Sequence, residues 1–238
     1  MIAPLGVTIV TPGYEAMAEE AIRRFKAATG CEAVLRIEVP EGEGFNAKLH
    51  LDELCPARPI VFFDADLWML REFDVGALMP VNDEWIAVHD PAVWDAESWP
   101  ARDCATHEME PGDYVNTGLF ACDLSKHFAR EIFARARALA STETMIDPTD
   151  QGLLNLARHR LQVPIRLLPA VFNFYPIAVA CGTFPFTPRG VIGLHAAGFP
   201  AADKLAALQH FALTLGGEHR PMTPAAMAVH HAATFDLR

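Results

Sequence analysis

The sequence predicts an α/β protein with a mostly parallel central sheet flanked by helices, and three observations carry this prediction. Residues 6–10 and 33–39 are strand-like and enclose an amphipathic helical pattern over residues 15–29, which is the opening of a βαβ unit. Residues 60–63 are apolar without alternation, as strands buried on both faces of a parallel sheet are. No linker-like stretch interrupts the chain, so we expect one domain.

The composition is that of an ordinary globular protein and excludes some classes of function. Of the 238 residues, 51% are hydrophobic and 21% are charged, and the net charge is −11. Lys and Arg form no cluster, so nucleic acid is not an expected partner. The five cysteines include no Cys-x-x-Cys pair, and no segment resembles a signal peptide or a transmembrane helix. We therefore expect a cytoplasmic protein with reduced thiols that is not an integral membrane protein.

Short apolar runs mark the expected strands. We expect strands at residues 6–10, 33–39, 60–63, 84–89, 114–122, 163–168 and 190–194. The first ends at Thr11 and Pro12, the fourth ends at Asp90, and the sixth ends at Pro169. The strand at 114–122 contains Gly118, and a glycine inside a strand often marks the close approach of a ligand or of another backbone.

Amphipathic spacing and terminal residues locate the expected helices. We expect helices at residues 15–29, 45–54, 124–140, 150–159 and 203–215, with one more within 221–238. Gly30 stops the first helix, Asp123 can cap the third, and either Asp147 or Thr149 can cap the fourth. Residues 91–113 show no clear periodicity and predict a long lid or binding loop.

Two carboxylates one residue apart, Asp64 and Asp66, follow the buried strand at 60–63. If the backbone stays extended through Asp66, both side chains point to the same side. In open α/β sheets, the crevice beyond the carboxyl ends of the strands is the usual ligand site. Neighbouring carboxylates repel each other and need a cation, and a hard divalent ion suits oxygen ligands. The pair therefore predicts a metal site that holds a phosphorylated ligand, although an isolated Asp-x-Asp is more often a solvated turn.

Several other residues remain open between a structural and a functional role. Tyr14 stands between the first strand and its helix, where it either packs or lies against a flat base. A lone lysine such as Lys48 on a short helix is usually solvated, and an acidic residue such as Asp150 at a helix start is usually there for capping. His195 closes an apolar strand, where a histidine is more often structural than a metal ligand.

Seven segments in order resemble the signature of glycosyltransferase family eight, the glycogenin-like retaining enzymes. The core of the resemblance is Ala47-Lys48-Leu49-His50-Leu51 followed by Val61-Phe62-Phe63-Asp64-Ala65-Asp66. The other segments are residues 11–14, 87–90, Tyr114-Val115-Asn116-Thr117-Gly118, Asp150-Gln151-Gly152-Leu153-Leu154-Asn155 and His195-Ala196-Ala197-Gly198. The resemblance spans about residues 7 to 204. In one place the chain departs from the family pattern: residues 199–203 precede Lys204, and no Pro-Trp follows it.

The resemblance implies a single GT-A domain over residues 1–238, a nucleotide-diphosphate-sugar donor and a divalent metal, Mn²⁺ or Mg²⁺. A UDP-hexose is the expected donor, and the acceptor is an unidentified glycan, lipid, protein or small molecule. The implied metal ligands are Asp64, Asp66 and His195. The implied donor-binding residues are Thr11, Tyr14, Lys48, Asp64, Ala65, Asp66, Gly198 and Lys204. The implied catalytic residues are Asn116, Asp147, Asp150 and Gln151.

The implied reaction is hexose transfer with retention at the anomeric carbon. The metal stabilises the charge that builds on the departing nucleoside diphosphate. An oxygen of Asp150 or Gln151 could steady the positive sugar ring. We favour attack by the acceptor on the leaving-group side, with a diphosphate oxygen taking the proton, over a covalent intermediate.

Two other classes of protein compete with this interpretation. Haloacid-dehalogenase-like phosphatases also place Asp-x-Asp after an apolar strand, but they normally carry Thr or Val where this chain has Trp68. A non-catalytic protein of the same fold would bind sugar nucleotide and metal without turnover. The sequence leaves the oligomeric state open, and a homodimer is compatible with it.

Overall fold

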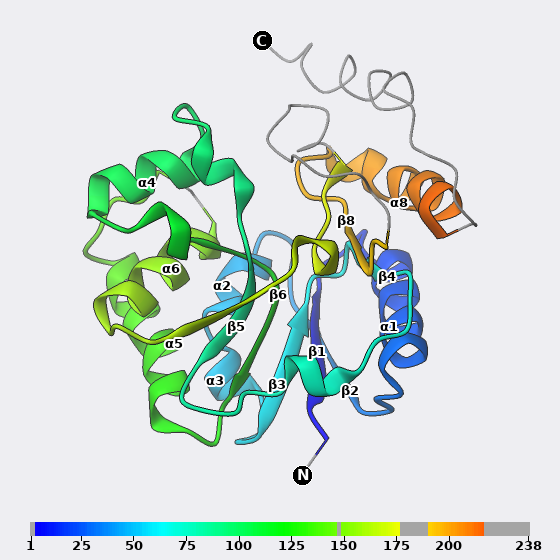
Figure 1. The fold of residues 1–238 in the computed structure, drawn as a ribbon, viewed down its shortest axis with the longest axis horizontal. Coiled ribbons are helices and arrows are strands. Elements are labelled where there is room, and N and C mark those ends of the chain that lie inside the picture. The colour runs from blue at the N-terminus through cyan, green and yellow to red at the C-terminus, as the bar shows by residue number, and fades with distance from the viewer. Residues whose placement is uncertain (1–2, 147–148, 177–189, 217–238) are drawn as a thin grey trace.

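The computed structural model describes residues 3–146, 149–176 and 190–216, and a six-stranded sheet forms its centre (Figure 1). The strands are β1 (Leu5–Val10), β2 (Val34–Glu38), β3 (Pro59–Phe63), β5 (Trp85–His89), β6 (Val115–Asp123) and β7 (Ile165–Leu168). Their order is β2-β1-β3-β6-β5-β7, and β6 alone runs antiparallel to its neighbours. The predicted α/β architecture with a mostly parallel sheet is confirmed.

A small second sheet stands at one end of the large one. It pairs β4 (Leu67–Met69) with β8 (Gly193–His195) in antiparallel register. The turn after β3 leads directly into β4, so the second sheet begins at the carboxyl end of a central strand.

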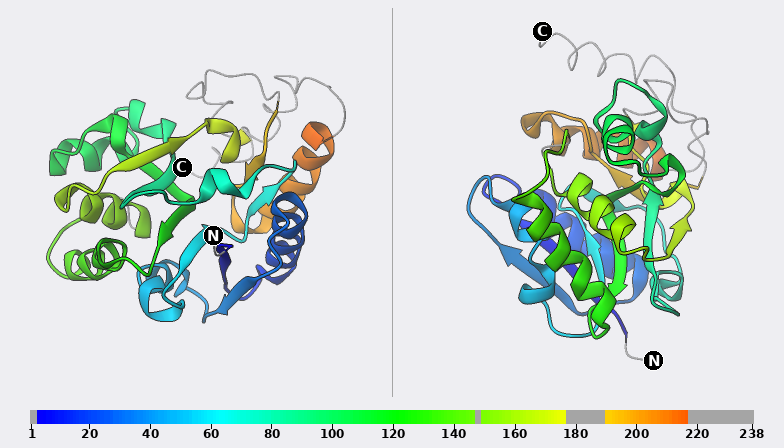
Figure 2. Two further views of the ribbon diagram at one scale, coloured as in Figure 1. Left: turned by 60° about the horizontal axis from the view of Figure 1, so that its bottom comes forward. Right: turned by 90° about the vertical axis from the view of Figure 1, so that its left-hand side faces the viewer.

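Helices cover both faces of the large sheet (Figures 1 and 2). The helices are α1 (Glu15–Thr29), α2 (Gly44–Lys48), α3 (Leu51–Leu54), α4 (Trp99–His107), α5 (His127–Ala140), α6 (Asp150–Arg160) and α8 (Ala201–Gly216). Short 3₁₀ turns lie at η1 (Val75–Leu78), η2 (Pro91–Trp94), η3 (Pro111–Asp113) and η4 (Ala170–Phe172). In Figure 1, α1 and α8 lie to the right of the sheet, whereas α4, α5 and α6 lie to its left.

Strand residues alternate between two apolar layers, one on each face. Phe62 and Phe120 stack on the α5 side, with ring centroids 5.0 Å apart, and both belong to the cluster that includes the α5 residue Phe133. Phe63 faces the other way and stacks on Phe25 of α1 at 4.5 Å. Large buried aromatic rings contribute much of the burial energy of a core. The sheet is therefore held rigidly from both sides, and its strand ends are fixed in position.

The structure corrects several predicted elements. The expected helix at 45–54 is two short helices, α2 and α3, because the chain bends at Leu49 and His50. The expected loop at 91–113 contains α4, which Ser98 caps by accepting a hydrogen bond from the Ala101 amide at 3.2 Å. Asp123 does not cap α5. Its carboxylate instead accepts from the Ser125 amide in the turn before the helix.

The predicted α6 cap and the cysteines can be checked in the structure, whereas some other predictions fall outside the described residues. Thr149 caps α6, and its hydroxyl accepts from the Gln151 amide. Asp147, Cys181 and the expected helix within 221–238 lie outside the described residues. The cysteines within the described ranges, Cys31, Cys55, Cys104 and Cys122, are free and buried.

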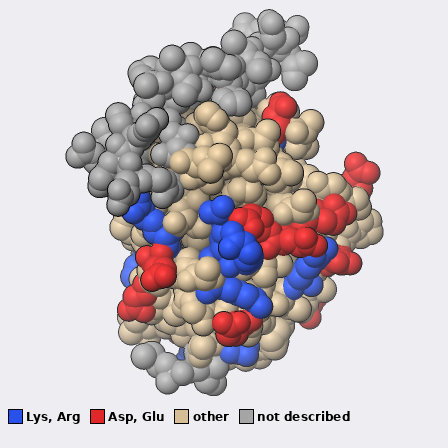
Figure 3. Space-filling view, turned by 90° about the vertical axis from the view of Figure 1, so that its right-hand side faces the viewer, with Lys and Arg blue, Asp and Glu red and all other residues tan. Residues whose placement is uncertain are grey.

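The distribution of surface charge and the hydropathy of the helices can be compared with the expectation that the protein neither binds nucleic acid nor spans a membrane. On the face drawn in Figure 3, basic and acidic side chains lie side by side rather than in separate patches. On α1, Arg24 pairs with Glu20 at 2.7 Å. Among the helices of the described residues, none is both long and apolar enough to cross a membrane.

Candidate active site

A turn, rather than an extended strand, presents the two carboxylates. β3 ends at Phe63, and Asp64, Ala65 and Asp66 form a turn closed by the Leu67 amide, which donates to the Asp64 carbonyl at 3.0 Å. The backbone is therefore not extended through Asp66, because the chain changes direction there to begin β4. The two side chains converge through this turn.

His195 reaches the same place through the small second sheet. In the β4–β8 register, His195 lies opposite Leu67, directly after Asp66. The next amide, that of Ala196, donates to the Asp66 carbonyl at 3.0 Å. Pairing between two three-residue strands from distant parts of the sequence thus brings the imidazole beside the carboxylates.

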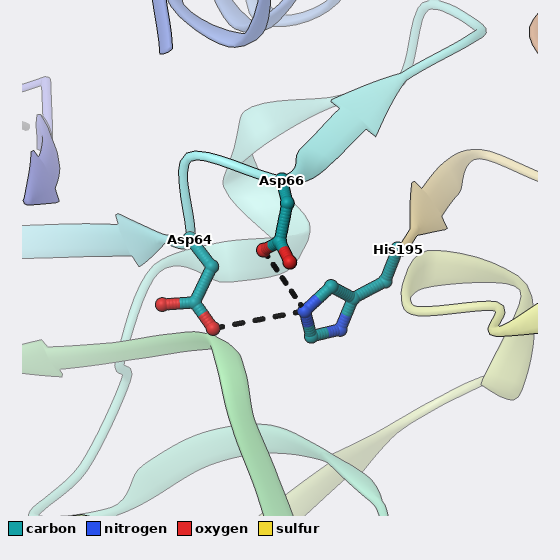
Figure 4. Close-up of side chains that lie close together, drawn as sticks. All are labelled: Asp64, Asp66 and His195. Carbon is teal, nitrogen blue, oxygen red and sulfur yellow. Dashed lines mark ion pairs between the residues drawn. The ribbon is translucent and has the colours of Figure 1, made fainter. Parts of the chain in front are cut away.

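The three side chains point toward a common point (Figure 4). His195 Nε2 lies 3.3 Å from Asp66 Oδ1 and 3.7 Å from Asp64 Oδ2, and one ligand atom from each residue lies within 4.8 Å of the others. Asp66 and His195 are buried, whereas 27% of the Asp64 side chain is exposed. Two carboxylates and one imidazole, partly open on one side, match the donors that Mn²⁺ or Mg²⁺ accepts and leave positions for further oxygen ligands.

Lys204 contacts the carboxylate of Asp66 from the first turns of α8. Burial by itself raises the pKa of Asp66, but His195 and Lys204 more than offset this, so the pKa lies well below its usual range. Burial lowers the pKa of Lys204, and Asp66 more than offsets that, so its pKa is raised. The residues inserted before Lys204 do not keep it out of the site, because α8 begins at Ala201 and carries it inward.

Lys48 lies buried between two carboxylates. Its Nζ lies 3.0 Å from Asp64 Oδ1 and 3.2 Å from Asp150 Oδ2. Burial alone would lower the pKa of Lys48, but Asp150 and Asp64 outweigh it and the pKa is raised. Burial raises the pKa of Asp150, and Lys48 and Thr117 only partly offset this effect. A lone lysine on a short helix is usually solvated, but Lys48 is buried and ion-paired.

Gln151 is held at both ends of its amide. Its Nε2 donates to Asp90 Oδ2 at 2.9 Å, and its Oε1 accepts from the Thr117 amide at 3.1 Å and from Asn116 Nδ2 at 2.9 Å. Asp90 is buried at the end of β5. The first turn of α6 is thereby tied to both β5 and β6, which fixes one wall of the site.

A cavity of about 460 Å³ lies over these residues. Of the residues predicted from the family resemblance, those that line it are Thr11, Tyr14, Lys48, Asp64, Ala65, Asp66, Asn116, Asp150, Gln151, His195, Gly198 and Lys204. Asp147 lies outside the described residues. The structure thus brings the predicted donor, metal and sugar residues to one cavity of the size that small-molecule ligands occupy.

Sequence reasoning missed three polar residues around the cavity. Thr117 donates its hydroxyl to Asp150 Oδ2 at 2.8 Å, Asp90 holds Gln151, and Asn173 contacts His195. Asn173 stands alone between Phe172 and Phe174, and a single polar residue in an apolar stretch was the available signal. Nothing in the sequence indicated which residues they would contact.

Gly118 leaves room for the imidazole. A Cβ at this position would lie 2.3 Å from His195 Cε1 and 2.9 Å from Nδ1, which is too close for any side chain. A glycine within this strand predicted the close approach of a ligand or of another backbone. In the structure, the group that lies close to Gly118 is the side chain of His195.

Gly118→Ala is expected to displace the His195 ring and to weaken the binding of a divalent metal ion at least tenfold, the scale on which misplaced metal ligands act. Titration of the purified protein with Mn²⁺, followed by the electron paramagnetic resonance of the free ion, measures this. Gly112→Ala is the matched control, because an added Cβ there meets nothing within 4 Å. Equal affinities for the two variants would contradict the placement of the ring.

Sequence comparison alone identifies no relative, since no family model and no curated protein matches the chain. Solved structures do match. The galactosyltransferase LgtC, in complex with donor and acceptor sugar analogs, is 16% identical with a TM-score of 0.64, covering 92% of this chain and 98% of that chain. The bifunctional glycosyltransferase WbbM is 14% identical with a TM-score of 0.63, covering 96% of this chain and 51% of that one.

The glycosyltransferase GlyE of Streptococcus pneumoniae TIGR4 is 12% identical with a TM-score of 0.62, and 98% of this chain and 64% of that chain are covered. The chain thus spans about half the length of WbbM and nearly the whole length of LgtC. Its fold is the GT-A fold of glycosyltransferases, as the motif resemblance predicted.

Proposed function

We propose that this protein is a metal-dependent retaining glycosyltransferase that moves a hexose from a nucleotide-diphosphate sugar, with a UDP-sugar as the expected donor. The observation that carries the proposal is the convergence of Asp64, Asp66 and His195 at one edge of a cavity of about 460 Å³. On a GT-A fold, this arrangement suits a diphosphate held through a divalent ion. The solved structures reported above as similar in fold are glycosyltransferases rather than phosphatases, which disfavours the phosphatase alternative.

The cations of the site support an anionic ligand in a chain of net charge −11. When bound, the metal ion would neutralise charge on the departing diphosphate. Lys48 and Lys204 would add two ammonium groups beside the carboxylates that hold the ion. Lys204 lies 5.7 Å from the ring of Tyr14, so this cation and this ring together border the place proposed for the nucleotide.

The sugar pocket would lie against Asn116, Asp150 and Gln151. Both ends of the Gln151 amide are already engaged, and Asp150 is buried with Lys48 and Thr117 as partners. Neither group is free to act as a nucleophile, which favours attack by the acceptor hydroxyl on the leaving-group side. The anomeric carbon–diphosphate bond breaks as the bond to the acceptor oxygen forms, and a diphosphate oxygen takes the acceptor proton.

UDP together with Mn²⁺ is expected to raise the Tm of the protein, and a chelator is expected to remove the rise. Ligand at about one hundred times its Kd stabilises the native state by about 2.7 kcal/mol. Differential scanning fluorimetry with UDP alone, Mn²⁺ alone and both together measures this. GDP and ADP serve as base controls, and the absence of a rise with every nucleotide would contradict the proposed site.

A donor screen then separates an enzyme from a binding protein. UDP-, GDP- and ADP-sugars are offered with Mn²⁺, and release of the nucleoside diphosphate is followed over time. We expect slow release even without acceptor, because water can take the place of the acceptor hydroxyl. Binding without release from any donor, with glycan acceptors also offered, would support the non-catalytic alternative instead.

A further inference from the structure

Asn173 is a buried amide that faces the imidazole of His195. Asn173 follows η4, and the next residue, Phe174, is bridged to Leu194 of β8. The His195 amide donates to the Phe174 carbonyl at 2.9 Å, so the two backbones are joined beside the site. Asn173 is 0% exposed, and its Oδ1 lies 2.9 Å from His195 Nδ1. The imidazole nitrogen that faces away from Asp64 and Asp66 therefore has a polar partner.

Backbone amides of β6 determine which way this Asn173 amide points. The Gly118 N–H donates to Asn116 Oδ1 at 2.8 Å, and Asn173 Nδ2 donates to the same oxygen at 2.7 Å. If the side-chain oxygen and nitrogen of Asn116 were exchanged, its NH₂ group would face the N–H of Gly118, and two hydrogen-bond donors would be opposed. Asn116 must therefore offer its oxygen, and Asn173 must direct its NH₂ toward Asn116 and its oxygen toward His195.

A second backbone amide supports the same orientation independently. The Thr117 N–H donates to Gln151 Oε1, which also accepts from Asn116 Nδ2 at 2.9 Å. The other end of the Gln151 amide donates to the carboxylate of Asp90, which can only accept when ionised. The NH₂ of Asn116 therefore points to Gln151, and its oxygen is left for Gly118 and Asn173. The backbone amides of Gly118 and Thr117 thus each require the same orientation of the Asn116 side-chain amide.

The orientation of the Asn173 amide determines which ring nitrogen of His195 carries the hydrogen. An amide oxygen can only accept, so Nδ1 must carry a hydrogen. The lone pair of a neutral ring is then on Nε2, the nitrogen that lies 3.3 Å from Asp66 and 3.7 Å from Asp64. A neutral imidazole free in water prefers the opposite tautomer, with its hydrogen on Nε2, which could not bind a cation through that nitrogen. Metal-binding histidines generally need a partner of this kind on the other nitrogen.

We propose that Asn173 is a positioning residue, which holds His195 in the Nδ1–H tautomer and orients its Nε2 lone pair toward the metal position. This inference rests on the proposed metal site. The hydrogen bonds from β6 through Asn116 to Asn173 fix the orientation of the Asn173 amide. The plane of the imidazole is confined by Gly118 and by the ring of Tyr175, which meets the His195 ring edge-on with 5.7 Å between the two ring centroids. Asn173 is not among the residues that line the cavity.

Asn173→Leu removes the acceptor and keeps a side chain of similar volume. We expect Mn²⁺ to bind this variant ten- to one-hundred-fold more weakly than the parent, the usual cost of losing such a partner. The titration uses the full chain and Mn²⁺ without nucleotide, followed by paramagnetic resonance of the free ion. Asn155→Leu is the matched control, because Asn155 is similarly buried and bonds the backbone of Val115 and of Gln151 rather than the imidazole of His195. Its folded state should keep the parent affinity even if its Tm falls.

The tautomer is observed directly by nitrogen NMR of histidine-labelled protein. We expect His195 Nδ1 to remain in the chemical-shift range of a protonated nitrogen in the metal-free protein and in the Mg²⁺-saturated protein. The resonance is assigned by its loss in His195→Gln. A His195 ring with hydrogen on Nε2 and none on Nδ1 would overturn the proposal, as would parent Mn²⁺ affinity in a folded Asn173→Leu. The spectrum of the parent tests the tautomer even if that variant does not fold. A parent that binds no Mn²⁺ would instead contradict the proposed function and leave the tautomer readable.

Discussion

Asp66→Ala is expected to abolish the rise in Tm that UDP and Mn²⁺ together produce in the parent. Asp66 is the more buried of the two carboxylates, and its pKa is held low by His195 and Lys204, so it is ionised at neutral pH and available to a cation. Without it, one carboxylate and one imidazole remain, and the ammonium of Lys204 loses the partner that it contacts here. The whole ligand-dependent stabilisation, about 2.7 kcal/mol at one hundred times the Kd, should disappear.

The measurement compares each variant with its own ligand-free Tm, because Asp66→Ala also changes the stability of the unliganded protein. Asp66→Asn keeps the shape of the side chain and separates loss of charge from loss of packing. Asp83→Ala removes an exposed carboxylate that does not line the cavity and should keep the parent response. If Asp66→Ala responds to UDP and Mn²⁺ like the parent, the metal assignment is wrong.

The carboxylate pair was predictable from the sequence because the signal is local. An apolar run followed by Asp64 and Asp66 indicates a strand that ends at a ligand site. Its geometry was not predictable, since the backbone turns after Phe63 in order to enter β4. A three-residue strand such as β4 has no periodicity of its own, and it forms because β8 lies beside it. Its existence depends on tertiary pairing.

His195 and Lys48 show the same limit. From residue type and position alone, each was more readily a structural or solvated group, and only the resemblance in motif order put both into a site. The place of His195 comes from the β4–β8 register, and Lys48 is held by ion pairs with Asp64 and Asp150 from two other segments. Partners far apart in sequence decide both roles, so they have no local signature.

Asn173 was missed for a related reason. Its role depends on η4 lying beside β8 and on amide hydrogens of β6, which are contacts between three separate segments. The helix α4 was missed because its polar and apolar residues give no clean spacing, although Ser98 two residues before Pro100 is a typical helix start. Capping residues therefore carried more information in that segment than hydrophobic periodicity did.

Lys48→Met is expected to destabilise the protein by about 3–5 kcal/mol, the cost of leaving a buried charge without its partner. The Lys48 side chain is 6% exposed and that of Asp150 is 2% exposed, with 3.2 Å between Nζ and Oδ2. Methionine fills a similar volume, so the loss reflects charge rather than a cavity. Equilibrium unfolding in urea measures it, and Lys126→Met, at an exposed lysine, should change the stability little.

The destabilisation should depend on pH in a defined direction. Burial already raises the pKa of Asp150 with Lys48 present, and removing the ammonium raises that pKa further. A carboxyl group whose pKa is higher in the folded than in the unfolded state favours folding at low pH, and this contribution is lost as the pH rises through the folded value. The free-energy deficit of Lys48→Met should therefore be smaller at pH 5 than at pH 8.

Replacing both partners separates stability from function at this pair. In the double variant Lys48→Met with Asp150→Asn, the buried carboxylate is gone, and an amide can still accept from the Thr117 hydroxyl. We expect most of the unfolding free energy to return, because an uncharged buried pair carries no desolvation penalty of this size. Release of nucleoside diphosphate should be lost in the double variant, since neither the ammonium proposed to face the anionic ligand nor the carboxylate proposed for the sugar pocket remains. A double variant that recovers turnover together with stability would show that the pair supports the fold alone.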